Sequence, residues 1–259
     1  MTDQERYLKV GVEAAKQAGV LFSRFFGKPK DVKFKNHDFR DQVTEVDLKI
    51  ETLIRRLLAH NFPDHKIIGE EFGRSTINKE DLVWIIDPID GTTNFIQGIP
   101  ICCISICLWD HKGPVIAVLY NPVLNKLYTA SRGRGAKLNG KTIKVSKERV
   151  LARALGGLGW LKLDEGVKLF TLMAKHCRKL RILASSAWQI SLVGSANYDF
   201  HVSYDINVWD FGAAMLIAQE AGGKVTDWKG KPVTLTTRSV VSSNGKLHKQ
   251  LLSLLKSLS

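Results

Sequence analysis

Apolar residues recur every three or four positions in two stretches near the start of the chain, a spacing that predicts amphipathic helices. The first predicted helix ends at Gly27 and Pro29, and the second ends before Asn61. A polar, basic connection from Lys30 to Arg40 separates them. The first apolar face comprises Tyr7, Gly11, Ala14, Ala15, Ala18, Leu21, Phe22 and Phe25, and the second Val46, Ile50, Leu53, Ile54, Leu57 and Leu58.

Shorter apolar runs dominate the middle of the chain and predict strands. The last of them contains Asn139-Gly140, a dipeptide typical of tight hairpins. The predicted strands cover residues 67–69, 82–86, 101–108, 115–120, 126–130 and 136–145.

The second part of the chain mixes helices and strands. Helices are predicted at 164–178, 186–195, 209–221 and 246–258, and extended segments at 181–183 and 198–204, with further short strands before the last helix. Gly222-Gly223 ends the third of these helices. Paired helices followed by a strand-rich middle predict an α+β layered sandwich. We expect a single domain over 1–259, with an α+β half at about 1–148 and an α/β half at about 149–259, meeting near 146–153.

Composition places the chain among globular proteins, since 44% of its residues are hydrophobic. No apolar run is long enough to cross a membrane, and the first residues lack the apolar core of a signal peptide, so a cytoplasmic location is expected. Cys102, Cys103 and Cys107 crowd into one apolar run, which favours a buried strand. No second ligand pair accompanies them, so zinc is not indicated.

The net charge of +13 is compatible with nucleic acid, an anionic surface or small anionic substrates. Lysine and arginine are spread widely, and no zinc-finger or aromatic-basic RNA motif accompanies them. Solvated basic faces are therefore favoured over a nucleic-acid groove, and electrostatic steering of small phosphorylated molecules fits equally well.

The most specific chemistry lies in the run from Trp84 to Phe95, where an apolar strand passes directly into Asp87-Pro88-Ile89-Asp90-Gly91-Thr92-Thr93. Two carboxylates can hold a hard divalent cation. Gly91 permits close backbone approach, and the two threonines offer donors to a phosphate. An ordinary Asp-Gly turn is the alternative, but such a turn does not require two acids, two threonines and a proline together.

Three further acids could join this site. Glu70 follows the short strand 67–69, where a surface acidic pair with Glu71 is the alternative. Asp47 stands three residues after Thr44, a spacing that also predicts a helix capping box, and both roles can coexist. Asp210 precedes a run of small residues, where it could simply cap a helix.

The Asp87–Phe95 run, together with Trp209–Ala214 and Glu220–Gly223, resembles the inositol monophosphatase family of lithium-sensitive, magnesium-dependent phosphatases. The resemblance covers nearly the whole chain. It implies a five-layer αβαβα sandwich, usually assembled as a homodimer, that acts on a small phosphorylated metabolite.

The resemblance also implies residue roles. Asp47 and Thr92 orient and activate the attacking water, and Glu70 assists. The implied metal ligands are Glu70, Asp87, the Ile89 carbonyl, Asp90 and Asp210, and the implied substrate contacts are Asp90, Gly91, Thr92, Thr93, Ser185, Ser186, Ser203 and Asp210. Because every ligand is an oxygen, Mg²⁺ or Mn²⁺ is expected rather than zinc.

The chain departs from the family pattern on the side that would receive the substrate alcohol. Ala184 stands where members often carry glycine, and Ser203 where inositol-specific members tend to carry a glutamate. Strict inositol specificity is therefore not expected. We expect hydrolysis of inositol 1-phosphate or related esters, with a broad fructose-1,6-bisphosphatase or NADP phosphatase as the alternative and histidinol phosphate as a further substrate.

A binding or regulatory protein without turnover is the alternative from another class. The presence of all the motif acids argues against it. A nucleotide-binding kinase is not expected, because the chain lacks a P-loop.

Overall fold

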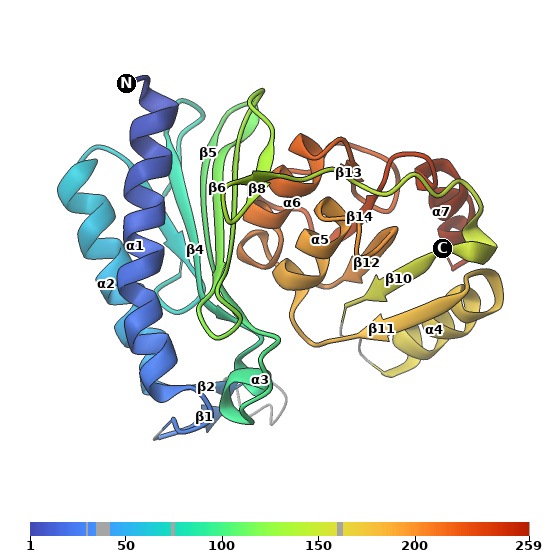
Figure 1. The fold of residues 1–259 in the computed structure, drawn as a ribbon, viewed down its shortest axis with the longest axis horizontal. Coiled ribbons are helices and arrows are strands. Elements are labelled where there is room, and N and C mark those ends of the chain that lie inside the picture. The colour runs from blue at the N-terminus through green and yellow to red at the C-terminus, as the bar shows by residue number, and fades with distance from the viewer. Residues whose placement is uncertain (30, 35–41, 74–75, 160–162, 259) are drawn as a thin grey trace.

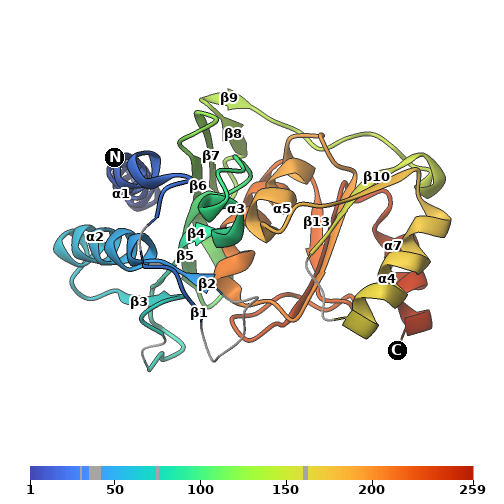
Figure 2. The same ribbon diagram turned by 90° about the horizontal axis from the view of Figure 1, so that it is seen from below.

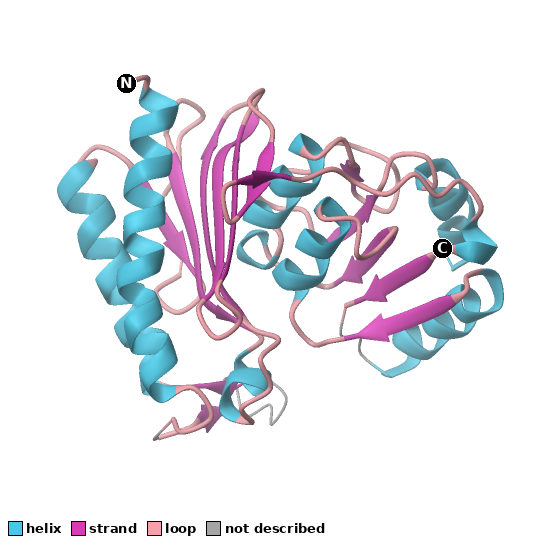
Figure 3. Ribbon diagram, viewed as in Figure 1, coloured by secondary structure: helices cyan, strands magenta, loops and turns pink. Residues whose placement is uncertain are grey.

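Helices and sheets alternate in five layers in the computed structural model of the chain, which describes residues 1–29, 31–34, 42–73, 76–159 and 163–258 (Figures 1 and 3). A helix pair covers one face of a seven-stranded sheet. A second pair lies between that sheet and a five-stranded sheet, whose far face is covered by a third pair (Figure 2). The layered α+β sandwich predicted from the pattern is confirmed.

The outer pair consists of α1 (Asp3–Phe25) and α2 (Glu45–Asn61), as predicted. Capping boxes at Thr2 and Thr44 satisfy the first backbone donors of the two helices. Their apolar faces pack with strand residues such as Trp84 in one core. Between them, β1 (Lys33–Phe34) pairs with β2 (Gln42–Val43), and most of the predicted Lys30–Arg40 connection lies outside the described residues.

The large sheet has the order β3-β4-β5-β6-β7-β8-β9. Only the β3–β4 pair among these strands is parallel. Its strands are β3 (Lys66–Gly69), β4 (Val83–Asp90), β5 (Cys103–Asp110), β6 (Gly113–Asn121), β7 (Lys126–Ser131), β8 (Ala136–Leu138) and β9 (Lys141–Thr142). All eight residues of β4 are buried, because helices cover both faces of the sheet.

The small sheet has the order β11-β10-β12-β14-β13, with β10 (Leu155–Leu158), β11 (Lys179–Ile182), β12 (Phe200–Tyr204), β13 (Lys224–Thr226) and β14 (Ser239–Ser243). Helices α5 (Ser186–Gly194) and α6 (Gly212–Glu220) lie between the two sheets. The outer helices are α4 (Leu163–His176) and α7 (His248–Leu255), and the remaining helical turns are α3 (Thr92–Ile96) and the 3₁₀ segments η2 (Leu151–Arg153), η3 (Val208–Asp210) and η4 (Lys256–Leu258).

Some predicted boundaries were wrong. The strand expected at 82–86 continues to Asp90, because its pairing with β5 resumes after an irregularity between Asp87 and Asp90. The helix expected at 209–221 begins as the separate turn η3, and the strand expected at 136–145 ends at Thr142. Strand β10 was missed because Gly156-Gly157 lacks strand propensity. Phe200 fills the space where a Gly156 side chain would lie.

The cysteines are all unpaired, and the three in the run 102–107 are buried as predicted. In the part of the chain that the structure describes, no helix is both long and apolar enough to cross a bilayer.

Candidate active site

The candidate site begins at the end of β4, where Asp87 and Asp90 are buried with exposed fractions of 1% and 6%. Asp87 Oδ1 accepts the Ile89 backbone N–H at 3.0 Å, which turns the strand locally. Gly91 follows with φ +89°, and a side chain there would meet the Ile101 carbonyl and Ser185 at 3.0 Å. Only glycine suits this position, and it turns the chain directly into α3.

Asp90 is bound from the start of α5, across the junction of the two sheets. Its Oδ1 accepts the Ser186 backbone N–H at 3.0 Å, and its Oδ2 accepts the Trp188 backbone N–H at 3.1 Å and the Ser185 hydroxyl. The Cys103 thiol lies 3.6 Å from Oδ2. The structure thus brings Ser185 and Ser186 to Asp90, and their predicted contact with substrate stays a prediction.

Thr92 joins the first turn of α3 to the first turn of α2. Its hydroxyl donates to the Ile89 carbonyl at 3.0 Å and lies 3.4 Å from Asp47 Oδ1. The other oxygen of Asp47 accepts the Thr44 backbone N–H at 2.8 Å and the Thr44 hydroxyl at 2.6 Å. Asp47 therefore belongs to the capping box of α2 and also faces Thr92, while its role in the site stays a prediction.

Burial and mutual repulsion dominate the electrostatics of the acids. Burial first, and then the charges of Glu70, Asp90 and Asp210, raise the pKa of Asp87 well above its usual value. Burial and the charge of Glu70 likewise raise the pKa of Asp210. Mutual repulsion among these acids thus contributes to the raised pKa values of Asp87 and Asp210, and a cation bound between them would relieve it.

Hydrogen bonds moderate two of these acids. Burial raises the pKa of Asp90 to about 6, although the hydrogen bonds from Ser185 and Trp188 oppose the rise. Burial also raises the pKa of Asp47 to about 6, against the Thr44 hydrogen bonds and with a further contribution from the Glu70 charge. Asp210 is not the cap of α6; its Oδ2 accepts the Asn207 backbone N–H at 2.6 Å within η3.

The donor chemistry fits Mg²⁺ or Mn²⁺, because the gathered groups are carboxylate oxygens and a carbonyl. Within the described ranges, no three Asp, Glu, His or Cys side chains already stand in an arrangement ready to hold a metal ion. At Asp90 both oxygens are engaged by donors from α5, so a cation would compete with those hydrogen bonds. The roles of the predicted ligands stay predictions.

The remaining predicted contacts lie less centrally. Thr93 is exposed and donates its hydroxyl to Gln42 Oε1 at 3.1 Å. Ser203 on β12 is fully buried, with its hydroxyl bound to His201 Nε2 and packed against Gly159. Its predicted contact with substrate stays untested.

Sequence reasoning missed several groups that build the site. Asn94 donates from one amide to the Ile101 and Leu183 carbonyls, both at 2.7 Å, and so ties α3 to the segment before α5. Its position within the Asp87–Phe95 motif was the only sequence feature that could have identified Asn94. No sequence feature could have identified the Trp188 backbone donor, because its contact with Asp90 depends on where α5 packs.

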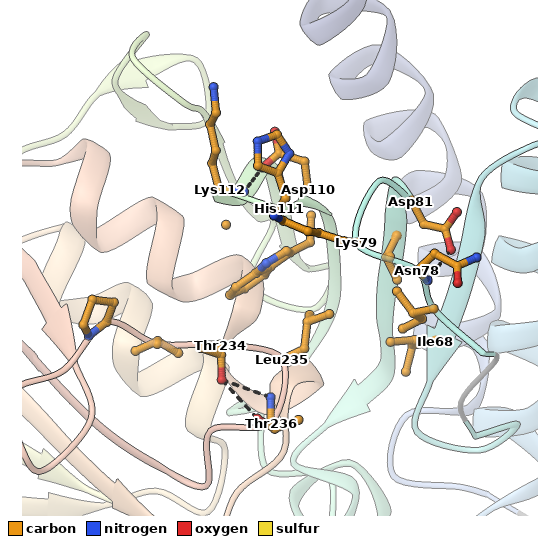
Figure 4. Close-up of a pocket in the computed structure, with 16 residues that line it drawn as sticks. Ile68, Asn78, Lys79, Asp81, Asp110, His111, Lys112, Thr234, Leu235 and Thr236 are labelled. Atoms are coloured by element: carbon orange, nitrogen blue, oxygen red, sulfur yellow. Dashed lines mark hydrogen bonds between the residues drawn. The ribbon is translucent and has the colours of Figure 1, made fainter.

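A cavity of about 590 Å³ is lined by other residues (Figure 4). Its labelled residues come from β3 and the segment before β4, from the end of β5 and the β5–β6 turn, and from the loop at 234–236. None of the predicted site residues lines it, so it is not where the proposed chemistry would occur.

Comparison with known proteins decides the family. The model of the inositol monophosphatase family matches residues 3–259. The chain belongs to the inositol monophosphatase family. As a member it is a phosphoric monoester hydrolase, and the resemblance identified from the motifs is confirmed.

Individual relatives match this chain over nearly the full length of both proteins. The chain is 40% identical to inositol monophosphatase 2 of Solanum lycopersicum over 94% of this chain and 95% of that protein. It is 35% identical to a Thermotoga maritima fructose-1,6-bisphosphatase/inositol-1-monophosphatase (94% and 93% covered) and 36% identical to a Pseudomonas aeruginosa Nus factor SuhB (95% and 94% covered).

The solved structure of a Thermotoga maritima IMPase matches this family member's fold with a TM-score of 0.90 at 34% identity, covering 98% of each chain. The fold class expected from the family resemblance is therefore confirmed.

Proposed function

We propose that the chain is a Mg²⁺-dependent phosphomonoesterase that hydrolyses inositol 1-phosphate or related small phosphate esters by direct attack of water. The observation that carries the proposal is the Thr92–Asp47 contact of 3.4 Å beside the mutually repelling acids. Hydrolysis at such a site requires a hydroxyl and a general base that together orient the attacking water. It also requires a cluster of oxygens that holds a cation.

The cation would be held by Glu70, Asp87, Asp90, Asp210 and the Ile89 carbonyl. When bound, Mg²⁺ supplies positive charge to the phosphoryl oxygens and lowers the pKa of a coordinated water. Mn²⁺ is the expected substitute, because it shares the preference for oxygen ligands.

The protein's own groups would direct the water. The single proton of the Thr92 hydroxyl is donated either to the Ile89 carbonyl at 3.0 Å or to Asp47 Oδ1 at 3.4 Å, so its lone pairs can accept a hydrogen bond from the attacking water. Asp47, with its pKa raised to about 6, is a stronger base than an ordinary aspartate and would receive the proton relayed through Thr92. Gly91, Thr92 and Thr93 would bind the phosphoryl group where β4 passes into α3.

Features of the alcohol side support a broad substrate range. Ser203 carries no charge and its hydroxyl is engaged by His201, so it offers no carboxylate to a ring of hydroxyls. A relative named for both fructose-1,6-bisphosphatase and inositol-1-monophosphatase activity supports sugar bisphosphates as alternative substrates. NADP and histidinol phosphate belong in the same comparison.

Phosphate release tests the proposal. Inositol 1-phosphate, fructose 1,6-bisphosphate, NADP⁺ and histidinol phosphate are each incubated with Mg²⁺, with Mn²⁺ and with EDTA. Metal-dependent release that EDTA abolishes is expected, and the ranking of kcat/KM identifies the substrate class. No release from any ester at several metal concentrations would overturn the proposal.

A regulatory role is the second hypothesis, because the chain carries a net charge of +13 and a relative is named Nus factor SuhB. Retention on RNA that weakens steeply with salt, from a protein without phosphatase activity, would favour it.

We also propose a cytoplasmic location and a homodimeric assembly. Four unpaired cysteines suit the reducing cytoplasm. The homodimer typical of the family is proposed for this chain, and light scattering coupled to gel filtration measures it.

A further inference from the structure

Glu51 is a fully buried carboxylate on α2 that the proposed chemistry does not use. Its Oε2 accepts the Glu71 backbone N–H at 2.9 Å. On the other side of Glu70 in the chain, a Cβ added at Gly69 would lie 1.9 Å from Glu51 Oε1. The carboxylate therefore contacts the residues immediately before and after Glu70.

Arg55 makes this buried charge tolerable. Its Nε donates to Glu51 Oε1 at 2.7 Å, one helical turn further along α2. The guanidinium also lies over the Phe72 ring, 5.4 Å from its centroid. Both oxygens of Glu51 thus have a donor, and the ion pair is in contact with the chain on the far side of Glu70.

Backbone hydrogen bonds also anchor the turn that carries Glu70. Glu70 follows β3, which is an edge strand, and its backbone N–H donates to the Ile86 carbonyl at 3.2 Å. Gly69 and Gly73 close the turn through paired backbone hydrogen bonds of 3.3 and 3.1 Å. In the metal-free protein the charges of Glu70 and Asp87 repel each other, which favours displacement of the Glu70 side chain. A fixed backbone on both sides opposes that displacement.

Helix α2 connects this anchor to the other end of the site. Asp47 and Glu51 are four residues apart, so they lie on one face of the helix. Asp47 faces Thr92, whereas Glu51 holds the turn that carries Glu70.

We propose that Glu51 is a positioning residue, which with Arg55 fixes Glu70 at the distance from the Asp47–Thr92 pair that metal binding requires. This inference rests on the proposed function. Groups that orient metal ligands without touching the metal typically contribute 10- to 100-fold to metal affinity, which sets the expected size of the effect.

Glu51→Gln tests the inference. The amide keeps the shape of the carboxylate but can accept only one of the two hydrogen bonds, leaving the Glu71 N–H or Arg55 without its partner. We expect Mn²⁺ binding, measured by titration calorimetry, to weaken by about tenfold. Exchange of the Glu71 amide proton should become about tenfold faster. The KM for the ester should change little once metal saturates.

Asp110→Asn is the matched control. Asp110 accepts two hydrogen bonds from Arg132, both at 2.9 Å, and lines the cavity shown in Figure 4. This variant should lose stability while Mn²⁺ affinity and Glu71 exchange stay unchanged. An equal weakening of metal binding in both variants would overturn the inference, because general destabilisation would then explain it.

Two further outcomes separate the inference from the proposed function. Unchanged metal binding and exchange in Glu51→Gln, with a wild type that binds metal and releases phosphate, would overturn the inference alone. A wild type that binds no metal would overturn both. If Glu51→Gln does not fold, hydrogen exchange of the Glu71 amide in the wild type tests whether Glu51 anchors the turn. A Glu71 amide as unprotected as a surface loop would contradict the anchor.

Discussion

Thr92 and Asp47 meet at 3.4 Å between hydroxyl and carboxylate, although 45 residues separate them in the chain. The contact forms because α2 and α3 both begin beside the end of β4. Thr44 holds one oxygen of Asp47 and leaves the other facing Thr92. These hydrogen bonds fix the orientation of both side chains.

Thr92→Val should lower kcat by about 10²- to 10⁴-fold, the usual contribution of a positioned proton-transfer group. Valine keeps the shape of threonine but cannot relay a proton to Asp47. Thr92→Ser keeps the hydroxyl and should retain most of the activity. Steady-state phosphate release measures both. Equal activity in the valine variant and the wild type would remove Thr92 from the mechanism.

Asp87→Asn should abolish metal-dependent turnover and stabilise the metal-free protein. The amide oxygen can still accept the Ile89 N–H, while repulsion by Glu70, Asp90 and Asp210 disappears. Thermal unfolding in EDTA should show a higher Tm than the wild type. A lower Tm would mean that Asp87 supports the fold rather than metal binding.

The stability that Asp47 and Asp90 contribute to the metal-free protein should fall as pH rises. The folded-state pKa values of Asp47 and Asp90 are raised to about 6, so the folded protein holds protons that the unfolded chain releases near pH 4. Stability from these groups is therefore fully present below about pH 4 and is lost as pH rises through about 6. Urea unfolding in EDTA across pH 4–8 measures the trend, and Mg²⁺ should restore stability at pH 7–8. The lowered pKa values of His201 and His248 change stability in the opposite direction between about pH 4 and 6.5, so the trend is the difference between the wild type and Asp47→Asn. A difference in the free energy of unfolding that does not vary with pH would contradict the raised pKa of Asp47.

Ala184→Gly should stabilise the protein by about 1 kcal/mol, because alanine is held there in the left-handed region that costs it about 1–2 kcal/mol. Ala184 has φ +52° just before α5. Ala196→Gly, at φ +60° after the same helix, is a control at a similar backbone angle. Urea unfolding should show a gain for both variants. A loss at Ala184 alone would indicate that its methyl group packs in a needed contact.

The spacing of apolar residues predicted much of the fold. The faces of α1 and α2 follow a helical period, and β4 through β7 read as apolar runs of strand length. Strand β10 could not be predicted, because its two glycines are selected by the bulk of neighbouring side chains such as Phe200. The extension of β4 to Asp90 depends on pairing with β5, which local sequence does not encode.

The amino-acid sequence alone determined the family and the class of reaction, phosphoric monoester hydrolysis, since the motif from Asp87 to Phe95 concentrates acids, glycine and threonines within a few residues. Tertiary structure decided how those groups are held. The backbone donors of α5 reach Asp90 from a segment about 96 residues away. Glu51 meets the Glu70 turn only because α2 packs beside the edge of the sheet. Such contacts depend on the relative placement of distant backbone segments, and no local pattern of side chains specifies that placement.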